Sequence, residues 1–268
     1  MNFKNLCRKL LASVFLILIA TPFVLGSIVV LNGLTHENTV APGETYRGSI
    51  EIQNTADTEK SVRVYIRDYI FNFKGESKHD APGTVARSNS GWIAYNPQLL
   101  NLAGGEKATI DFEVKVPTND SLKGTYWSVL MVEGIIPPDT TTHEQGVTIN
   151  TAIRYAIQVV TQIGNSGTSD LQFLGLELEK QDKNNILNVF VENTGERQLR
   201  PELALELFDE NGNSAGVLKA ERRKTFPGTS VKLGLNLEGI KPGKYTGVLV
   251  ADCDEDHVFG TNVSIEIE

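Results

Sequence analysis

The fold is decided by one stretch, Gly124-Thr125-Tyr126-Trp127-Ser128-Val129-Leu130, in which a glycine and a tyrosine lead into a nearly continuous apolar run. Such runs, bounded by turn residues, are typical of strands buried on both faces. Outward from it, apolar and polar residues alternate with a period of two, most clearly in Val62–Ile66 and Ala108–Val116. Glycine, proline and asparagine separate these runs. The sequence therefore predicts an all-β protein.

The deciding stretch is repeated later as Gly243-Lys244-Tyr245-Thr246-Gly247-Val248-Leu249. A second motif recurs in the same order, because Ile50–Thr55 is matched by Val189–Thr194, and both end in Asn-Thr. A Gly-x-Tyr entering a buried strand resembles the tyrosine corner of immunoglobulin-like sandwiches, where the hydroxyl bonds the backbone. We expect Tyr126 and Tyr245 to occupy equivalent positions in two related sandwiches.

The expected organisation is two immunoglobulin-like β-sandwich domains after an N-terminal signal segment. Residues 27–166 form the first domain and residues 167–268 the second, because the segment 164–169 is rich in glycine and serine, as linkers are. Within the second domain, an Asn-Gly pair in Asp209–Asn213 predicts a β-hairpin.

Residues 1–26 are expected to be a secretory signal peptide. An apolar stretch, Leu10–Leu25, follows three positive residues and precedes a small-residue cleavage site; the positive residues are Lys4, Arg8 and Lys9. An uncleaved membrane anchor is the alternative, because no charge occurs between Leu10 and His36. Both alternatives predict an exported protein, periplasmic or extracellular.

The charge balance narrows the class of partner. The whole chain has a net charge of −8, and loss of the basic signal segment makes it three units more negative. Nucleic acids and anionic membranes select basic surfaces, so we expect neither as a partner. Cys7 lies in the signal segment, which leaves Cys253 alone and excludes an intrachain disulfide after cleavage. No cofactor is predicted.

The longest predicted strand is Val147–Val159, in which every odd position is apolar or threonine. A polar, proline-rich segment, 137–145, precedes it. A long strand with an apolar face and a flexible leader is what strand addition to a partner's sheet requires. The alternative is a core strand that pairs only within its own domain.

Most of the mature chain resembles the periplasmic pilus-assembly chaperones of the PapD-like superfamily. The resemblance includes the signal, the two domains and the long strand. It also rests on Ser90-Gly91-Trp92-Ile93, Asn193-Thr194-Gly195, Phe226-Pro227-Gly228 and Lys241-Pro242-Gly243-Lys244-Tyr245.

The resemblance implies a role for the long strand. In that family, alternating apolar residues of this strand complete an unfinished subunit, and a basic residue further along anchors the subunit's terminal carboxylate. The partner-binding positions implied here are Val147, Ile149, Ile153 and Arg154, with Arg154 at the basic place. Gln145 is polar where the family has a donor residue, and Ser27–Tyr46 lacks the family's first-strand basic anchor, with only His36 nearby.

Two functions follow as hypotheses. The first is a non-enzymatic, chaperone-like assembly factor that binds pilus or other envelope subunits by β-strand addition, with self-association through Val147–Val159 when no partner is present. The second is a structural scaffold, because the architecture is also similar to WxL-interacting envelope proteins. An exposed strand edge at Val147–Arg154 favours the chaperone hypothesis, and an edge fully paired within its own domain favours the scaffold hypothesis.

Enzymatic chemistry has no specific support in the sequence. The chain contains no nucleophile elbow, phosphate loop or His-Glu-x-x-His motif, so we expect no catalytic residues. The only metal candidates, which we consider weak, are Asp252, Asp254, Asp256 and His257. An acidic hairpin turn is the simpler interpretation of that segment.

Overall fold

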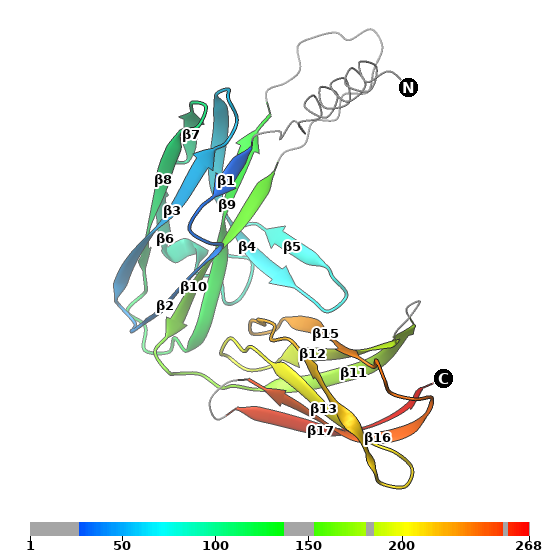
Figure 1. The fold of residues 1–268 in the computed structure, drawn as a ribbon. Coiled ribbons are helices and arrows are strands. Elements are labelled where there is room, and N and C mark those ends of the chain that lie inside the picture. Colours follow the sequence, from blue (N-terminus) through cyan, green and yellow to red (C-terminus); the bar gives the residue numbers. More distant parts are fainter. Residues whose placement is uncertain (1–26, 137–152, 181–184, 254–256, 268) are drawn as a thin grey trace, which may run out of the picture.

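The computed structural model describes residues 27–136, 153–180, 185–253 and 257–267. These residues form two β-sandwiches, set at a steep angle like the arms of an L (Figure 1). The all-β, two-sandwich fold predicted from the sequence is confirmed. Among the described residues, no helix has the length and apolar character needed to span a membrane.

The first sandwich consists of two sheets and one short 3₁₀-helix, η1 (Ser90–Trp92). One sheet has the order β1 (Ile28–Val30), β3 (Thr45–Asn54), β8 (Lys107–Lys115), β6 (Ile93–Asn96). The other has the order β2 (Thr35–Val40), β10 (Arg154–Ile163), β9 (Gly124–Ile135), β4 (Lys60–Phe71), β5 (Ser77–Asp80), and β7 (Leu99–Leu102) also pairs with β4.

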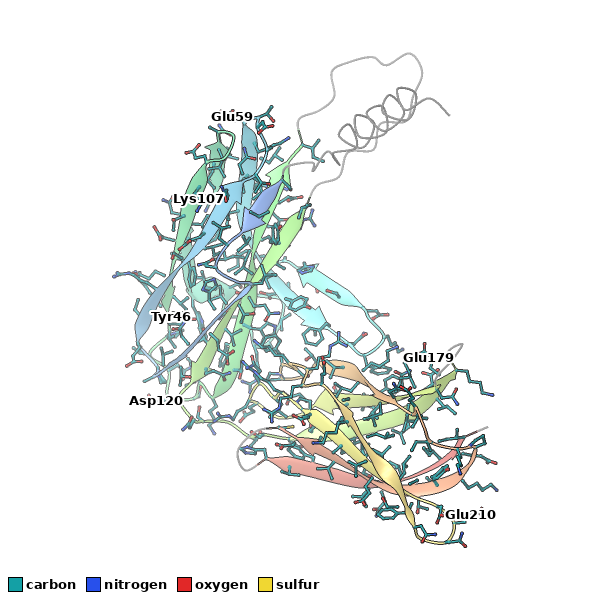
Figure 2. The ribbon with its side chains drawn as sticks, viewed as in Figure 1. Tyr46, Glu59, Lys107, Asp120, Glu179 and Glu210 are labelled. Carbon is teal, nitrogen blue, oxygen red and sulfur yellow. The ribbon has the colours of Figure 1, made fainter. Side chains whose placement is uncertain are left out.

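The second sandwich repeats this plan with fewer strands. Its first sheet has the order β11 (Leu171–Lys180), β12 (Asn185–Asn193), β15 (Ser230–Asn236). Its second sheet has the order β14 (Ser214–Ala220), β13 (Glu202–Phe208), β16 (Gly243–Asp252), β17 (Val258–Ile267). The predicted hairpin is confirmed, because β13 and β14 flank a turn in which Asp209 N–H donates to Asn213 O (2.9 Å). Figure 2 shows Glu210 of this turn at the far extremity of the molecule.

Each sandwich has its own hydrophobic core. In β8 the predicted alternation is confirmed, since Ile110 and Val114 are fully buried and Phe112 is 3% exposed. The core of the first sandwich extends to Ile163 and that of the second begins at Leu171. The predicted boundary at residue 166 lies between these two residues and stays a prediction.

Two buried asparagines show that the sandwiches are related. Asn54 and Asn193 each end a strand and have no exposed surface. In both, the side-chain oxygen accepts the N–H two residues later, and the amide donates to the carbonyl four residues later and to a more distant carbonyl. The repeated Asn-Thr motif therefore marks the same turn in both units, held by the same side chain.

The tyrosine prediction is half right. The Tyr245 hydroxyl donates to Lys241 O (2.8 Å), as a tyrosine corner requires. The Tyr126 hydroxyl has no hydrogen bond within the described residues, so this part of the prediction is wrong. Its ring packs instead against Trp92, with centroids 4.8 Å apart, and the Arg87 guanidinium lies over the Tyr126 ring, 5.4 Å from its centroid, as a cation–π partner. The partly exposed hydroxyl does not need a protein partner.

Candidate functional site: the open edge of β10

The structure describes only part of the predicted donor strand. Val147 and Ile149 lie outside the described residues, whereas Ile153 and Arg154 lie within them. The strand itself runs over Arg154–Ile163, so the predicted end at Val159 is wrong. The strand continues through the polar residue Thr161, which is fully buried because its hydroxyl forms a hydrogen bond with the Tyr46 hydroxyl (2.7 Å).

The two edges of β10 are covered to different extents. On one side, β9 pairs antiparallel with it from Arg154 to Ile163. On the other side, β2 pairs parallel with it only from Gln158 to Ile163. No strand of the described chain pairs with Arg154–Ile157 on that second side. The first part of β10 is therefore an open sheet edge.

The backbone directions show which groups the edge presents. Ile153 O accepts from Gly134 of the β9 side (3.4 Å), and Gln158 N–H donates to Leu34 O on the β2 side (2.9 Å). Because successive residues of a strand direct their backbone groups to opposite edges, Arg154 and Ala156 direct theirs to the uncovered side. The open edge thus offers two N–H and two C=O groups to an added strand.

A strand switch creates this partial coverage. The chain leaves β1 in one sheet, crosses through residues 31–34, and enters β2 in the other sheet. Gly33 has φ = 91°, a conformation that favours glycine. Asn32 fixes the crossing, since its amide donates to Ser49 O (2.7 Å) and its oxygen accepts from Glu51 N–H (3.0 Å). The crossing reaches the β10 edge only at Gln158.

Apolar side chains are exposed around the open edge. Ile153 is 43% exposed, and Leu31 and Leu34 of the crossing are 42% and 48% exposed. Ile135, the last residue of β9, and Ile136, which follows it, are also exposed. An uncovered edge bordered by apolar side chains is a surface on which another strand can pair and bury area.

The outer face of the same sheet carries an ionic row. Glu133 of β9 lies between Arg63 of β4, whose guanidinium donates to Oε2 (2.8 Å), and Arg154 of β10, whose guanidinium donates to Oε1 (2.6 Å). The bonds from Arg63 and Arg154 hold the pKa of Glu133 well below its usual range, at about 2. Arg154, predicted to anchor a partner's carboxylate, is therefore already paired with a carboxylate of its own chain.

His36 does not replace the missing first-strand anchor. Its ring meets the edge of Phe112, with centroids 5.3 Å apart, and its Nε2 is buried without a protein partner. Burial lowers the pKa of His36, so the imidazole is neutral at pH 7. A neutral, core-facing ring cannot bind a carboxylate at the edge.

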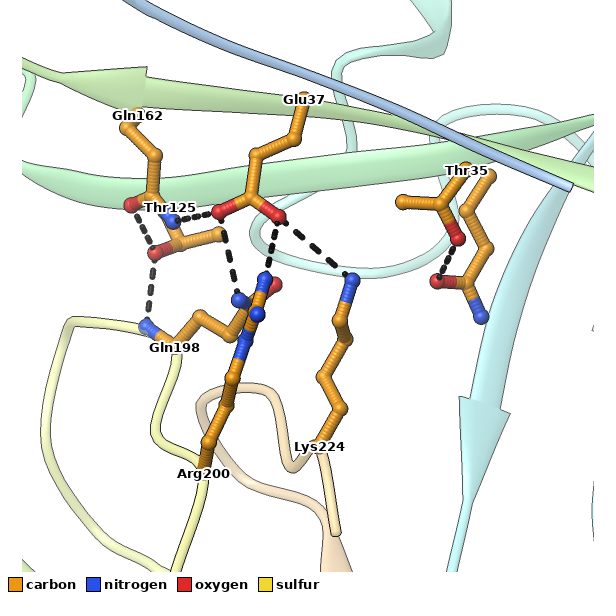
Figure 3. A network of polar contacts seen from close by, with 8 residues as sticks. Thr35, Glu37, Thr125, Gln162, Gln198, Arg200 and Lys224 are labelled. Carbon is orange, nitrogen blue, oxygen red and sulfur yellow. Dashed lines mark hydrogen bonds and ion pairs between the residues drawn. The ribbon is translucent and has the colours of Figure 1, made fainter. Parts of the chain in front are cut away.

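The second sandwich is fixed beside the covered half of β10 by an ionic network (Figure 3). Glu37 of β2 accepts from Arg200 (2.9 Å) and lies 3.5 Å from Lys224, both of the second sandwich. Gln162 of β10 also donates to Glu37 (3.1 Å). Burial raises the pKa of Glu37, but the Gln162 bond and the two cations outweigh it, and the pKa is lowered.

Aromatic contacts complete the interface between the sandwiches. The Trp127 ring stacks on Phe226 at 4.7 Å and 7°, and its Nε1–H donates to Tyr69 O (2.7 Å). The β4–β5 hairpin reaches across, because the Phe73 ring lies 4.7 Å from that of Phe190. The sequence did not reveal this interface. It places the second sandwich beside Val160, in the part of β10 that β2 covers.

The weak metal candidates are only partly described. Asp252 and His257 lie in the structure, whereas Asp254 and Asp256 lie outside the described residues. Cys253 N–H donates to His257 O (2.9 Å), which places the segment at the turn between β16 and β17. Within the described ranges, no three His, Cys, Asp or Glu residues are grouped as metal ligands would be. Burial raises the pKa of the Cys253 thiol to about 11.

Several solved structures resemble this chain. The class 5 fimbriae chaperone CfaA is 12% identical, with a TM-score of 0.47, over 89% of this chain and 98% of its own. The CsuC–CsuE chaperone–tip adhesion subunit complex of Acinetobacter baumannii matches at 14% identity and a TM-score of 0.42, over 87% and 97%. The Salmonella enterica SafA pilin–SafB chaperone complex matches at 9% and 0.43, over 89% and 97%.

Pilus and fimbrial chaperones are thus among the structures that the chain resembles, as the sequence predicted. The strand pairing described above establishes the fold of this chain. No protein-family model and no curated protein matches the sequence.

Proposed function

We propose that this protein is an exported, non-enzymatic assembly factor that binds pilus or other envelope subunits by adding one of their strands to β10. The observation that carries the proposal is the uncovered edge at Arg154–Ile157, next to an edge that β2 covers from Gln158 onward. The proposed location is the periplasm or the cell exterior. The first sandwich, residues 27–166, supplies the docking edge.

The energetics favour a strand as the bound element. In the free protein, water can satisfy the backbone groups of Arg154 and Ala156 that face the open side. An apolar segment that docks there displaces this water, so it must bring backbone groups of its own in strand geometry. The exposed Ile153, Leu31 and Leu34 add apolar area, each contributing about 25 cal/mol for every Å² that a partner buries. Backbone bonds give affinity and these side chains select apolar partners.

The scaffold hypothesis requires this edge to be paired with another strand of its own domain. Within the described residues it is not, so we favour strand addition. Val147 and Ile149 precede the open edge in the same predicted strand, and we propose that they belong to the same docking surface.

Photo-cross-linking in the native envelope tests the proposal. A p-benzoylphenylalanine in place of Ile153 is expected to cross-link to a pilus or surface-protein subunit, identified by mass spectrometry. The matched control places it at Val217, which is 57% exposed on β14 of the second sandwich and far from the edge. Equal cross-linking from both positions, or none from Ile153, contradicts strand addition at β10.

A further inference from the structure

The outer face of the first sandwich carries a row of charges that ends at the open edge. Arg63, Glu133 and Arg154 lie directly opposite one another on the neighbouring strands β4, β9 and β10. Their charges alternate as positive, negative, positive, and both contacts are close ion pairs. The next position in this row belongs to whatever strand pairs with β10.

The next row toward the second sandwich is uncharged. Tyr65, Met131 and Ala156 lie opposite one another on the same three strands, and Met131 is 2% exposed. The row after it ends at Gln158, whose outer neighbour is already Thr35 of β2. Among the residues that the structure describes, the charged row and the apolar row are therefore the two that are open to an added strand on this face.

We propose that the segment that adds to β10 carries an acidic side chain opposite Arg154 and an apolar side chain two residues away, opposite Ala156. This inference rests on the proposed function and names the chemistry of its partner. The acidic group is an internal side chain of the docked strand, so a terminal carboxylate is not needed.

Charge complementarity carries the proposal. Two guanidinium groups share the single Glu133 carboxylate, and the Arg154 side chain is 52% exposed while one of its nitrogens is used. The other N–H groups of Arg154 can donate to a second carboxylate. Opposite charges directly across a strand pair stabilise the pairing, and a lysine at the same place would face Arg154 as a like charge.

The second row, which ends at the small residue Ala156, matches an apolar neighbour. Ala156 has only a methyl side chain, and the row continues inward to the buried Met131 and the partly buried Tyr65. A charged group there would lie beside apolar atoms, with Arg154 as its nearest cation on the strand. An apolar side chain extends the existing row, and its burial carries no desolvation penalty.

Synthetic nine-residue peptides test the inference with the purified protein. The peptides are blocked at both ends, alternate valine and threonine, and carry glutamate, glutamine or lysine at the fourth position and valine at the sixth. Fluorescence anisotropy is expected to show the glutamate peptide binding roughly two- to fivefold more tightly than the glutamine peptide and roughly tenfold more tightly than the lysine peptide. The difference is expected to shrink in 1 M salt.

Arg154→Gln is expected to make the three peptides bind alike. The matched control is Arg47→Gln, because Arg47 is also directly opposite a glutamate partner, Glu113, but in the other sheet. The control is expected to keep the full preference for glutamate. Thermal unfolding of both variants checks that each remains folded.

The outcomes separate the inference from the function on which it rests. Equal binding of the glutamate and lysine peptides to the unmodified protein overturns the acidic partner while strand addition stands. A glutamate preference that survives Arg154→Gln overturns the assignment to this charged row. Failure of all three peptides to bind contradicts strand addition, and this inference with it.

Discussion

Ala156→Pro separates the docking edge from the fold more sharply than any other single change. Ala156 directs its N–H to the uncovered side of β10, so a proline there removes no hydrogen bond to β9. Edge positions whose N–H is not in the ladder tolerate proline. We expect the free energy of unfolding to change by about 1 kcal/mol or less, which reflects the adjustment of φ.

Partner binding is expected to respond strongly to the same change. β10 loses the Ala156 N–H donor, and the carbonyl of the added strand that faces it is left unpaired, which costs about 1–3 kcal/mol. The dissociation constant should therefore rise by roughly 5- to 150-fold. The measurement combines urea unfolding with anisotropy of the blocked glutamate peptide.

Ile157→Pro is the matched control. Ile157 directs its N–H toward β9 and its side chain is fully buried, so this variant should lose about 3 kcal/mol or more of stability. If Ala156→Pro unfolds the protein as Ile157→Pro does, the Ala156 N–H is hydrogen-bonded within its own chain and the edge is closed. If it folds and still binds normally, the partner docks elsewhere.

Three further changes test other parts of the argument. Asn193→Ala should lower the unfolding free energy by about 2–4 kcal/mol in urea, because this buried side chain makes three hydrogen bonds, whereas Asn236→Ala on the exposed strand end should cost under about 1 kcal/mol. Glu37 should stabilise the contact between the sandwiches fully above its ordinary pKa of 4.5 and lose that contribution on further acidification, so Glu37→Gln should flatten this part of the pH–stability curve. Ile149→Asp, outside the described residues, should abolish partner binding at unchanged melting temperature, and a large drop in that temperature would make Ile149 a core residue.

Local patterns in the sequence were sufficient to predict the fold class. Alternation in β8 and the repeated Asn-Thr and Gly-x-Tyr motifs depend on neighbouring residues, and these signals predicted strands and two related units. Asn54 and Asn193 explain why the Asn-Thr motif recurs, since each side chain closes the turn that follows its strand. The Gly-x-Tyr motif predicted the hydroxyl bond of Tyr245 but not the surroundings of Tyr126, whose ring packs against Trp92.

The candidate site was only partly predictable, because it depends on which strands pair over long distances. β2 has the sequence Thr-His-Glu-Asn-Thr-Val, without an apolar face, so the alternation of apolar and polar residues does not predict it as a strand. Its pairing with β10 joins residues more than a hundred positions apart and decides where the edge opens. The row of Arg63, Glu133 and Arg154 likewise requires the register of three strands.

The stacking of Trp127 on Phe226 gives the molecule an optical reporter of its own. The chain has two tryptophans, and Trp92 lies within the first sandwich against Tyr126. After Trp92→Phe, the remaining indole fluoresces from the contact between the sandwiches, where it is 1% exposed. A red shift of its emission, with strand circular dichroism unchanged, would reveal the two arms of the L separating while each stays folded.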